Sequence, residues 1–176
     1  MRKVLTLLLI FCVWLGYSCV IQAQHISQGN EFEALMQKIR QDFAQNPDIT
    51  QGLEKYNVQD GSFTDVDYAS IQRTNWPPLV HINRISDFVF AYTNPKNRYY
   101  QNEDLYNKIE KGLEYWHERN PWCHNWWYNQ IAEPQALGVL LIQMRTGKKQ
   151  LPHELENKLL ERIKKDGGNP AKWTGA

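Results

Sequence analysis

Cysteine is scarce in this chain, and its placement excludes a disulfide framework. The 176 residues include three cysteines, of which Cys12 and Cys19 lie in the first 23 residues and Cys123 stands alone in the remainder. If the first 23 residues are removed on export, no internal disulfide can form. We therefore expect the fold to be held together by packing.

An excess of charge of either sign is also missing. Lys and Arg number 20 against 19 Asp and Glu, which gives a formal net charge of +1 at pH 7. Nucleic-acid-binding domains usually carry a clear basic excess, so we expect no nucleic-acid partner. Attraction to an acidic polymer would have to come from a local arrangement of groups rather than from the overall field.

The sequence contains no hydrophobic run long enough for a comfortable membrane span. Residues 4–16 are apolar apart from Thr6, whereas a transmembrane helix needs about 20 apolar residues. This run follows Arg2 and Lys3 and leads to small or polar residues up to Ala23, which is typical of a secretory signal peptide. We predict a signal peptide over 1–23 and a secreted or periplasmic chain of residues 24–176, without a membrane span. Lipoprotein processing at Cys19 is the alternative, although Gly16 stands where a lipobox has an apolar residue.

Strict alternation of apolar and polar residues, the pattern of a half-buried strand, does not occur. Apolar residues recur instead at spacings of three and four, which predicts amphipathic helices. We therefore expect an all-α protein of antiparallel helical hairpins, with apolar faces broad enough to receive further helices. The expected helices cover about 32–43, 79–93, 102–119, 133–147 and 152–167.

Polar and aromatic residues are concentrated in the segments between these helices. Residues 60–68 are polar and contain Gly61, which predicts a loop. Residues 120–132 are predicted to form an aromatic-rich connection, followed by a helix that opens at Glu133-Pro134, where proline suits the first helical position. Histidines are present without a compact metal-ligand motif, so we expect no metal and no cofactor. The five are His25, His81, His117, His124 and His153.

Aromatic residues are abundant, with seven Trp and nine Tyr. The segment from Asn125 to Leu137 reads NWWYNQIAEPQAL, and it resembles the N-W-W-x-x-E/Q-I-G/A-x-P-x-A signature of polysaccharide lyase family 8. Asp60-Gly61-Ser62-Phe63, with Asp65 and Tyr68, resembles an earlier loop of the same family. Further resemblances occur at Asn75-Trp76, Tyr99-Tyr100, 144–149 and 174–176. The similarity covers essentially all of residues 24–176 and is greatest for the chondroitin AC lyase branch.

This resemblance implies a fold and a reaction. The fold is an incomplete (α/α) toroid, of which residues 24–176 would be a truncated N-terminal α-helical domain. The reaction is β-elimination at a uronic acid of an acidic polysaccharide, carried out by an Asn that neutralises the uronate and by His, Tyr and Arg. The resemblance places that Asn directly after Ala176 and the other residues beyond it. No catalytic residue is therefore assigned here, and the missing C-terminal part of the same enzyme is an expected partner.

The resemblance assigns substrate-binding residues to one segment of this chain. The family's adjacent Trp pair forms a hydrophobic patch in the substrate cleft and falls on Trp126 and Trp127, with Asn125 as their polar neighbour. From packing alone the pair could equally fill the core, but two adjacent Trp cannot both point inward from a regular helix. We expect a substrate-binding platform of Asn125, Trp126 and Trp127. We expect Trp76, Trp116 and Trp122 to lie in the core or in the wall of the cleft.

Three functional classes follow for the chain. It is part of a glycosaminoglycan-degrading lyase of the chondroitin or hyaluronan type, or a non-catalytic polysaccharide-binding protein, or an inactive remnant of a truncated lyase gene. Whether coding sequence continues after Ala176 separates these classes. We expect the 176 residues alone to lack lyase activity.

Overall fold

The computed structural model describes residues 31–167, which divide into two units after Asp42. Residues 31–42 of the first unit form one helix. Residues 31–167 contain no strand, only an isolated antiparallel bridge between Tyr56 and Phe63, so the all-α prediction is confirmed. The second unit contains α2 (Thr50–Lys55), α3 (Leu79–Thr93), α4 (Glu103–Arg119), the π-helical turn η1 (Tyr128–Ala132), α5 (Glu133–Met144) and α6 (His153–Asp166).

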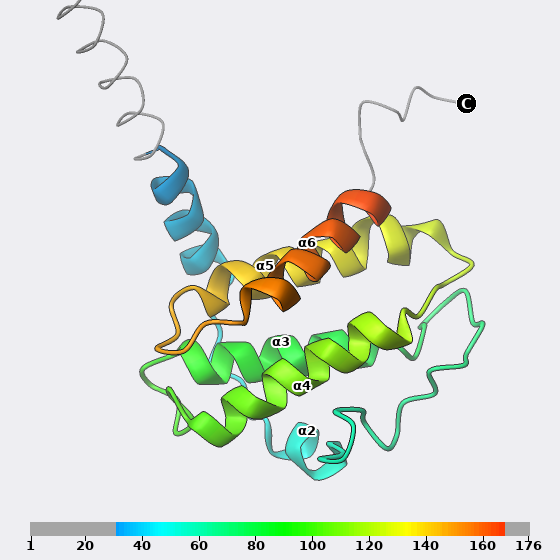
Figure 1. Cartoon of the computed structure of the whole chain (residues 1–176), viewed down its shortest axis with the longest axis horizontal. Helices are drawn as coiled ribbons and strands as arrows, with labels where there is room; N and C mark the ends of the chain where they lie inside the picture. Colours follow the sequence, from blue (N-terminus) through cyan, green and yellow to red (C-terminus); the bar gives the residue numbers. More distant parts are fainter. Residues whose placement is uncertain (1–30, 168–176) are drawn as a thin grey trace, which may run out of the picture. The chain divides into compact units, whose positions relative to one another are not determined.

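The four long helices of the second unit form two antiparallel hairpins, α3–α4 and α5–α6 (Figure 1). Helices α3 and α5 run parallel, because Trp76 contacts Tyr128 near their N-terminal ends and the Tyr92 hydroxyl donates to the Lys149 carbonyl beyond their C-terminal ends. Helices α4 and α6 are likewise parallel to each other. The Tyr106 hydroxyl donates to the Gln150 carbonyl at one end, and Arg162 lies over the Trp116 ring at the other.

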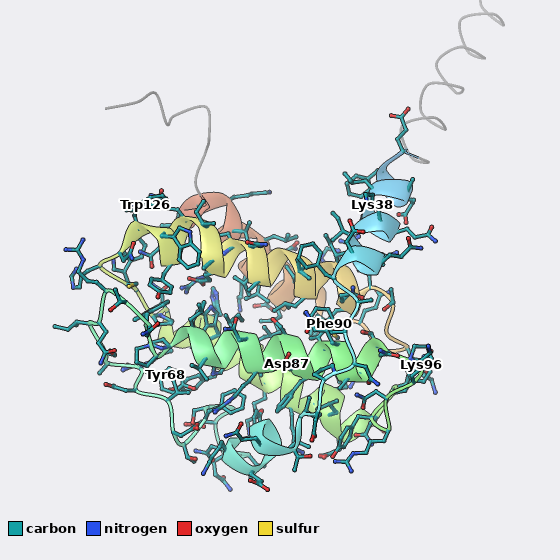
Figure 2. The ribbon with its side chains drawn as sticks, turned by 180° about the vertical axis from the view of Figure 1, so that it is seen from behind. Lys38, Tyr68, Asp87, Phe90, Lys96 and Trp126 are labelled. Carbon is teal, nitrogen blue, oxygen red and sulfur yellow. The ribbon has the colours of Figure 1, made fainter. Side chains whose placement is uncertain are left out.

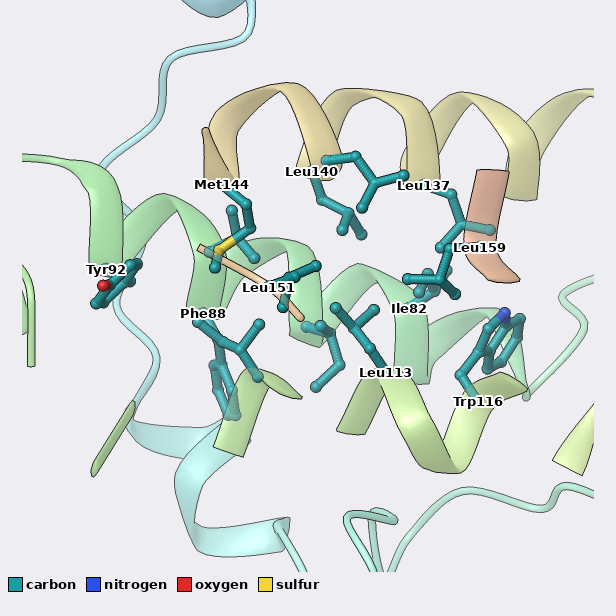
Figure 3. Close-up of a cluster of buried hydrophobic side chains, with 14 of the residues drawn as sticks. Ile82, Phe88, Tyr92, Leu113, Trp116, Leu137, Leu140, Met144, Leu151 and Leu159 are labelled. Atoms are coloured by element: carbon teal, nitrogen blue, oxygen red, sulfur yellow. The ribbon is translucent and has the colours of Figure 1, made fainter. Parts of the chain in front are cut away.

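The core fills the space between these two hairpins, as Figure 3 shows. The residues at spacings of three and four in the sequence are the ones that become buried. Each fully buried aliphatic or aromatic side chain of this kind stabilises a fold by about 1.5–3 kcal/mol. The principal core residues are Ile82, Ile85, Phe88, Val89 and Tyr92 of α3, Leu105, Ile109, Leu113 and Trp116 of α4, Leu137, Leu140, Leu141 and Met144 of α5, and Leu155 and Leu159 of α6.

Helix α4 has well-defined ends that match its predicted range. The Asn102 side chain accepts a hydrogen bond from the Leu105 backbone N–H at 2.8 Å, which satisfies one of the unpaired donors of the first turn. At the other end, Asn120 adopts a left-handed conformation with φ of 46°, which asparagine tolerates well. Helix α2 was not among the expected helices, since its six residues carry too few apolar positions to show a period.

The predicted connection over 120–132 is wrong for its second half. Residues 126 and 127 are already helical, and they continue through η1 into α5 without a break. Pro134 lies inside this helix and lacks the N–H that would bond back to the Gln130 carbonyl. The chain widens just before it into a π turn, in which the Glu133 N–H bonds to the Tyr128 carbonyl. Proline therefore marks an irregular turn here rather than a helix start.

The loop predicted at 60–68 is present and is fixed against α4. Gly61 has φ of +84°, and a Cβ atom there would lie 2.5 Å from the Lys111 carbonyl oxygen. Glycine is thus required both by the backbone conformation and by the close approach. The Asp60 carboxylate closes the turn by accepting from the Ser62 backbone N–H at 2.9 Å.

Several sequence-based predictions fall on parts of the chain outside the described residues. The predicted signal peptide over 1–23, with Cys12 and Cys19, is one of them, and residues 174–176 are another.

Cys123 is a buried free thiol. Within residues 31–167, no helix combines the length and apolar character needed to cross a membrane.

Candidate functional site

Trp126 and Trp127 occupy the first two positions of the helix that continues into α5, and both reach the surface. Trp126 is 54% exposed and Trp127 46%, so neither indole belongs to the core. Figure 2 shows Trp126 where this helix begins. Large apolar rings are costly to leave in water, and a contiguous exposed apolar patch marks a surface that contacts a ligand or another part of a protein.

Asn125 caps the helix that presents the two rings. Its side-chain oxygen accepts from the Trp127 backbone N–H at 3.1 Å, and its amide nitrogen donates to the Arg73 carbonyl at 2.9 Å. The first bond satisfies an unpaired donor of the first turn, and the second ties the cap to the segment before α3. One amide hydrogen and one lone pair of Asn125 remain for other partners.

A buried polar contact fixes the segment that leads into the pair. The Asn129 amide accepts from the Cys123 backbone N–H at 3.0 Å and donates to the Cys123 carbonyl at 2.6 Å. Tyr128 continues this scaffold, since its ring lies 5.7 Å from that of the buried Trp76. The pair therefore projects from an ordered base: Trp127 and Trp126 are exposed, while the neighbours behind them are buried or partly buried.

Glu133 and Arg162 form a buried ion pair behind the same segment. Glu133 also accepts from the Trp116 indole N–H at 2.8 Å. Arg162 donates to the Asn120 side chain at 2.6 Å and to the Pro121 carbonyl at 3.0 Å. Burial raises the pKa of Glu133, against the opposing effects of the Arg162 guanidinium and the Trp116 donor. This pair connects α4, α5 and α6 to the connection that leads to the tryptophans.

A second hydrogen-bonded chain ties the 60–68 loop to the core. The Phe63 backbone N–H donates to the Tyr68 hydroxyl at 2.9 Å, and that hydroxyl lies 2.8 Å from His81 Nδ1. His81 Nε2 lies 2.9 Å from the Gly112 carbonyl, which can only accept, so Nε2 carries the proton and Nδ1 accepts from Tyr68. Burial lowers the pKa of His81 to about 4. His81 and Tyr68 are therefore engaged with each other inside the fold.

Beside Trp127 the surface is hollowed between α3 and α5. The hollow has a volume of about 400 Å³. Its sides are one face of each helix, and Trp127 stands at the end near the N-termini of both. Its lining residues are Phe43, Gln45, Leu79, Asn83, Ser86, Asp87, Phe90, Trp127, Ala132, Gln135, Ala136 and Val139.

The other three tryptophans considered in the sequence analysis lie either in the core or at the surface. Trp76 and Trp116 are 2% and 0% exposed and belong to the core, whereas Trp122 is 59% exposed.

No group of three or more His, Cys, Asp or Glu side chains in residues 31–167 is placed to hold a metal ion. The sequence analysis missed the roles of Asn129, Glu133 and Arg162, since a lone polar residue on a helix face carries no signal of the contact it will make.

Comparisons with known proteins agree with the motif resemblance. Residues 21–176 match the family model described as polysaccharide lyase family 8, N-terminal alpha-helical domain. Chondroitinase-AC of Pedobacter heparinus is 44% identical over 117 residues, which cover 66% of this chain and 16% of that protein. A solved structure of chondroitinase AC lyase, from a study of its enzyme–oligosaccharide complexes, matches with a TM-score of 0.75 and 36% identity over 81% of this chain and 22% of its own. The chain thus spans less than a quarter of the length of either protein.

Proposed function

Because this chain belongs to polysaccharide lyase family 8, we propose that it is the N-terminal, carbohydrate-binding portion of a secreted lyase that cleaves an acidic glycosaminoglycan. The substrate class is chondroitin or hyaluronan, and the bond is broken by β-elimination at a uronic acid. Two similar proteins are named as chondroitinase AC enzymes, which supports this class of substrate. The observation that carries the proposal is the exposed pair Trp126 and Trp127 on an ordered helix start.

In this proposal the two indoles form a platform for sugar rings. A pyranose ring presents C–H groups on its faces, and a contact with an aromatic face contributes on the order of 1 kcal/mol beyond the area buried. The rings require no charge to do this, which suits a chain without a basic excess. Asn125 fixes the pair by capping its helix, and its remaining amide hydrogen and lone pair are available to a sugar hydroxyl.

The elimination itself needs acid–base groups and a group that neutralises the uronate, in addition to this platform. A base must take the C5 proton of the uronate, the 4-linked oxygen must leave with a proton, and a double bond forms between C4 and C5. Neutralising the carboxylate charge makes the C5 proton acidic enough for this step, and positioned acid–base groups move the protons. We propose that the C-terminal part of the same enzyme supplies these groups.

The platform is tested by calorimetric titration of Trp126→Ala and Trp127→Ala with unsulfated chondroitin and hyaluronan oligosaccharides. Each substitution should weaken binding by at least about 1 kcal/mol, as expected for loss of an aromatic contact, while circular dichroism keeps the parent helical signal. Tyr100→Ala is the control, since it removes an exposed aromatic ring outside the platform. Loss of helicity in both variants, with normal binding by the protein that still folds, would assign the pair to the core instead.

We also propose that residues 1–23 direct export and that the mature chain begins near Gln24 in the periplasm or outside the cell. The pattern of Arg2 and Lys3 followed by a short apolar run supports this. N-terminal sequencing of the exported protein should begin near Gln24. A soluble cytoplasmic form that keeps Met1 would rule the proposal out.

A further inference from the structure

The groove between α3 and α5 continues from the tryptophan platform along the surface. Its lining residues on α3, from Leu79 to Phe90, are separated by 11 positions, so the groove is about 16 Å long at the rise of an α-helix. Trp127 stands at one end and Gln45 at the other, where the Asn94 amide donates to the Gln45 carbonyl beyond the C-terminus of α3. An elongated groove that begins at an exposed indole has the shape required for a strand of sugar rings rather than for a compact ligand.

One side of the groove carries polar groups from α3, and Asp87 is the only charged residue among them. Asp87 and Phe90 are labelled on this helix in Figure 2. Asp87 is partly buried, and burial raises the pKa of its carboxyl. Within residues 31–167 no side chain donates a hydrogen bond to this carboxylate or pairs with it. A carboxylate that has lost part of its hydration without gaining a donor favours a ligand that brings one.

The rest of the groove is largely apolar. It is lined by Leu79 of α3, Ala132 of η1, and Ala136 and Val139 of α5, and Gln135 lies among them as an exposed amide. No lysine or arginine lines the groove, so a carboxylate or sulfate placed there would meet Asp87 without a compensating cation. Like charges at close range in a partly buried site repel strongly. The part of the groove beside Asp87 therefore disfavours the acidic unit of a glycosaminoglycan.

We propose that the part of this groove beside Asp87 binds the neutral N-acetylhexosamine unit of the polymer, with Asp87 as the specificity-determining hydrogen-bond acceptor. The inference rests on the proposed function and goes further by assigning one sugar type to one place. An N-acetyl group carries a methyl, which can contact the apolar lining, and an N–H, which can donate to the Asp87 carboxylate. Asp87 thereby fixes the register of an alternating polymer.

The experiment compares two methyl glycosides, one of N-acetylgalactosamine and one of glucuronic acid, by calorimetric titration at pH 7. The parent chain is expected to bind the N-acetylgalactosamine glycoside more tightly. Asp87→Asn keeps the shape of the side chain but removes its charge, so the preference should fall by about tenfold, the effect expected for one charge-assisted hydrogen bond. Asp104→Asn is the matched control, because Asp104 is an exposed acid on α4 outside the groove, and it should leave the preference unchanged.

The inference and the proposed function fail in different ways. A preference of the parent for the glucuronic acid glycoside, or a preference that Asp87→Asn leaves unchanged, overturns the assignment of the groove. If unsulfated chondroitin oligosaccharides still bind in a manner that depends on Trp126 and Trp127, the proposed function stands. If neither the glycosides nor the oligosaccharides bind the parent chain, the proposed function fails as well.

Discussion

Glu133 and Arg162 show how one buried pair stabilises the segment behind the tryptophans. Their side chains are 2% and 6% exposed, so removing one partner leaves the other charge buried without compensation. Such losses cost about 3–5 kcal/mol. We expect Glu133→Ala to lower the free energy of unfolding by this amount in urea titrations followed by circular dichroism.

An exposed pair on α6 provides the control for this substitution. Glu154 and Lys158 are in contact at 2.7 Å, with side chains 81% and 46% exposed. Exposed pairs contribute little to stability, so Glu154→Ala should leave the urea midpoint close to that of the parent. A similar loss from both substitutions would mean that the buried position of Glu133 is not what makes it important.

His81 makes the stability of the chain depend on pH. Its pKa is about 4 in the folded protein against about 6.5 in an unfolded chain. The unfolded state therefore binds more protons between these values, and stability is lost as pH falls from about 6.5 to 4. The loss amounts to about 3 kcal/mol by linkage. Urea titrations across this range measure it, and an equally steep loss in His81→Gln would assign the effect to carboxylates instead.

At the scale of elements, the start of the helix at Trp126 depends on its cap. Asn125→Ala removes the acceptor for the Trp127 N–H and should cost about 1 kcal/mol, with fraying confined to the first turn. Serine caps nearly as well as asparagine. Asn125→Ser should therefore restore the stability that alanine loses, and hydrogen exchange at Trp127 reports the turn directly. Equal exchange in the alanine and serine variants would contradict a capping role.

The same elements show what the sequence could and could not predict. Helices α3, α4, α5 and α6 were predicted because their apolar residues recur at spacings of three and four. The start at Trp126 was missed because Pro134 was taken as a first helical residue, when it follows a π turn. The exposed pair Trp126 and Trp127 was found from its motif, whereas the groove beside it was not. A groove depends on how two helices pack, and the polar positions of one helix do not reveal its neighbour.

At the scale of the whole molecule, the chain is the all-α N-terminal part of an (α/α) toroid. We expect the 176 residues alone to show no elimination of chondroitin or hyaluronan. The neighbouring His81 and Tyr68 are bonded to each other inside the fold and cannot serve a substrate at the surface. The assay is the ultraviolet absorbance of the unsaturated uronate product, and turnover that survives stringent purification would refute this expectation.

The central claim, that Trp126 and Trp127 bind the polysaccharide, is tested most directly by NMR of the indole N–H groups. Each tryptophan gives one such signal, which single Trp→Phe variants assign. On titration with unsulfated chondroitin oligosaccharides, the signals of Trp126 and Trp127 should shift with a common dissociation constant. Those of the buried Trp76 and Trp116 should remain in place. Shifts confined to other tryptophans, or no shift at saturating oligosaccharide, would contradict the account.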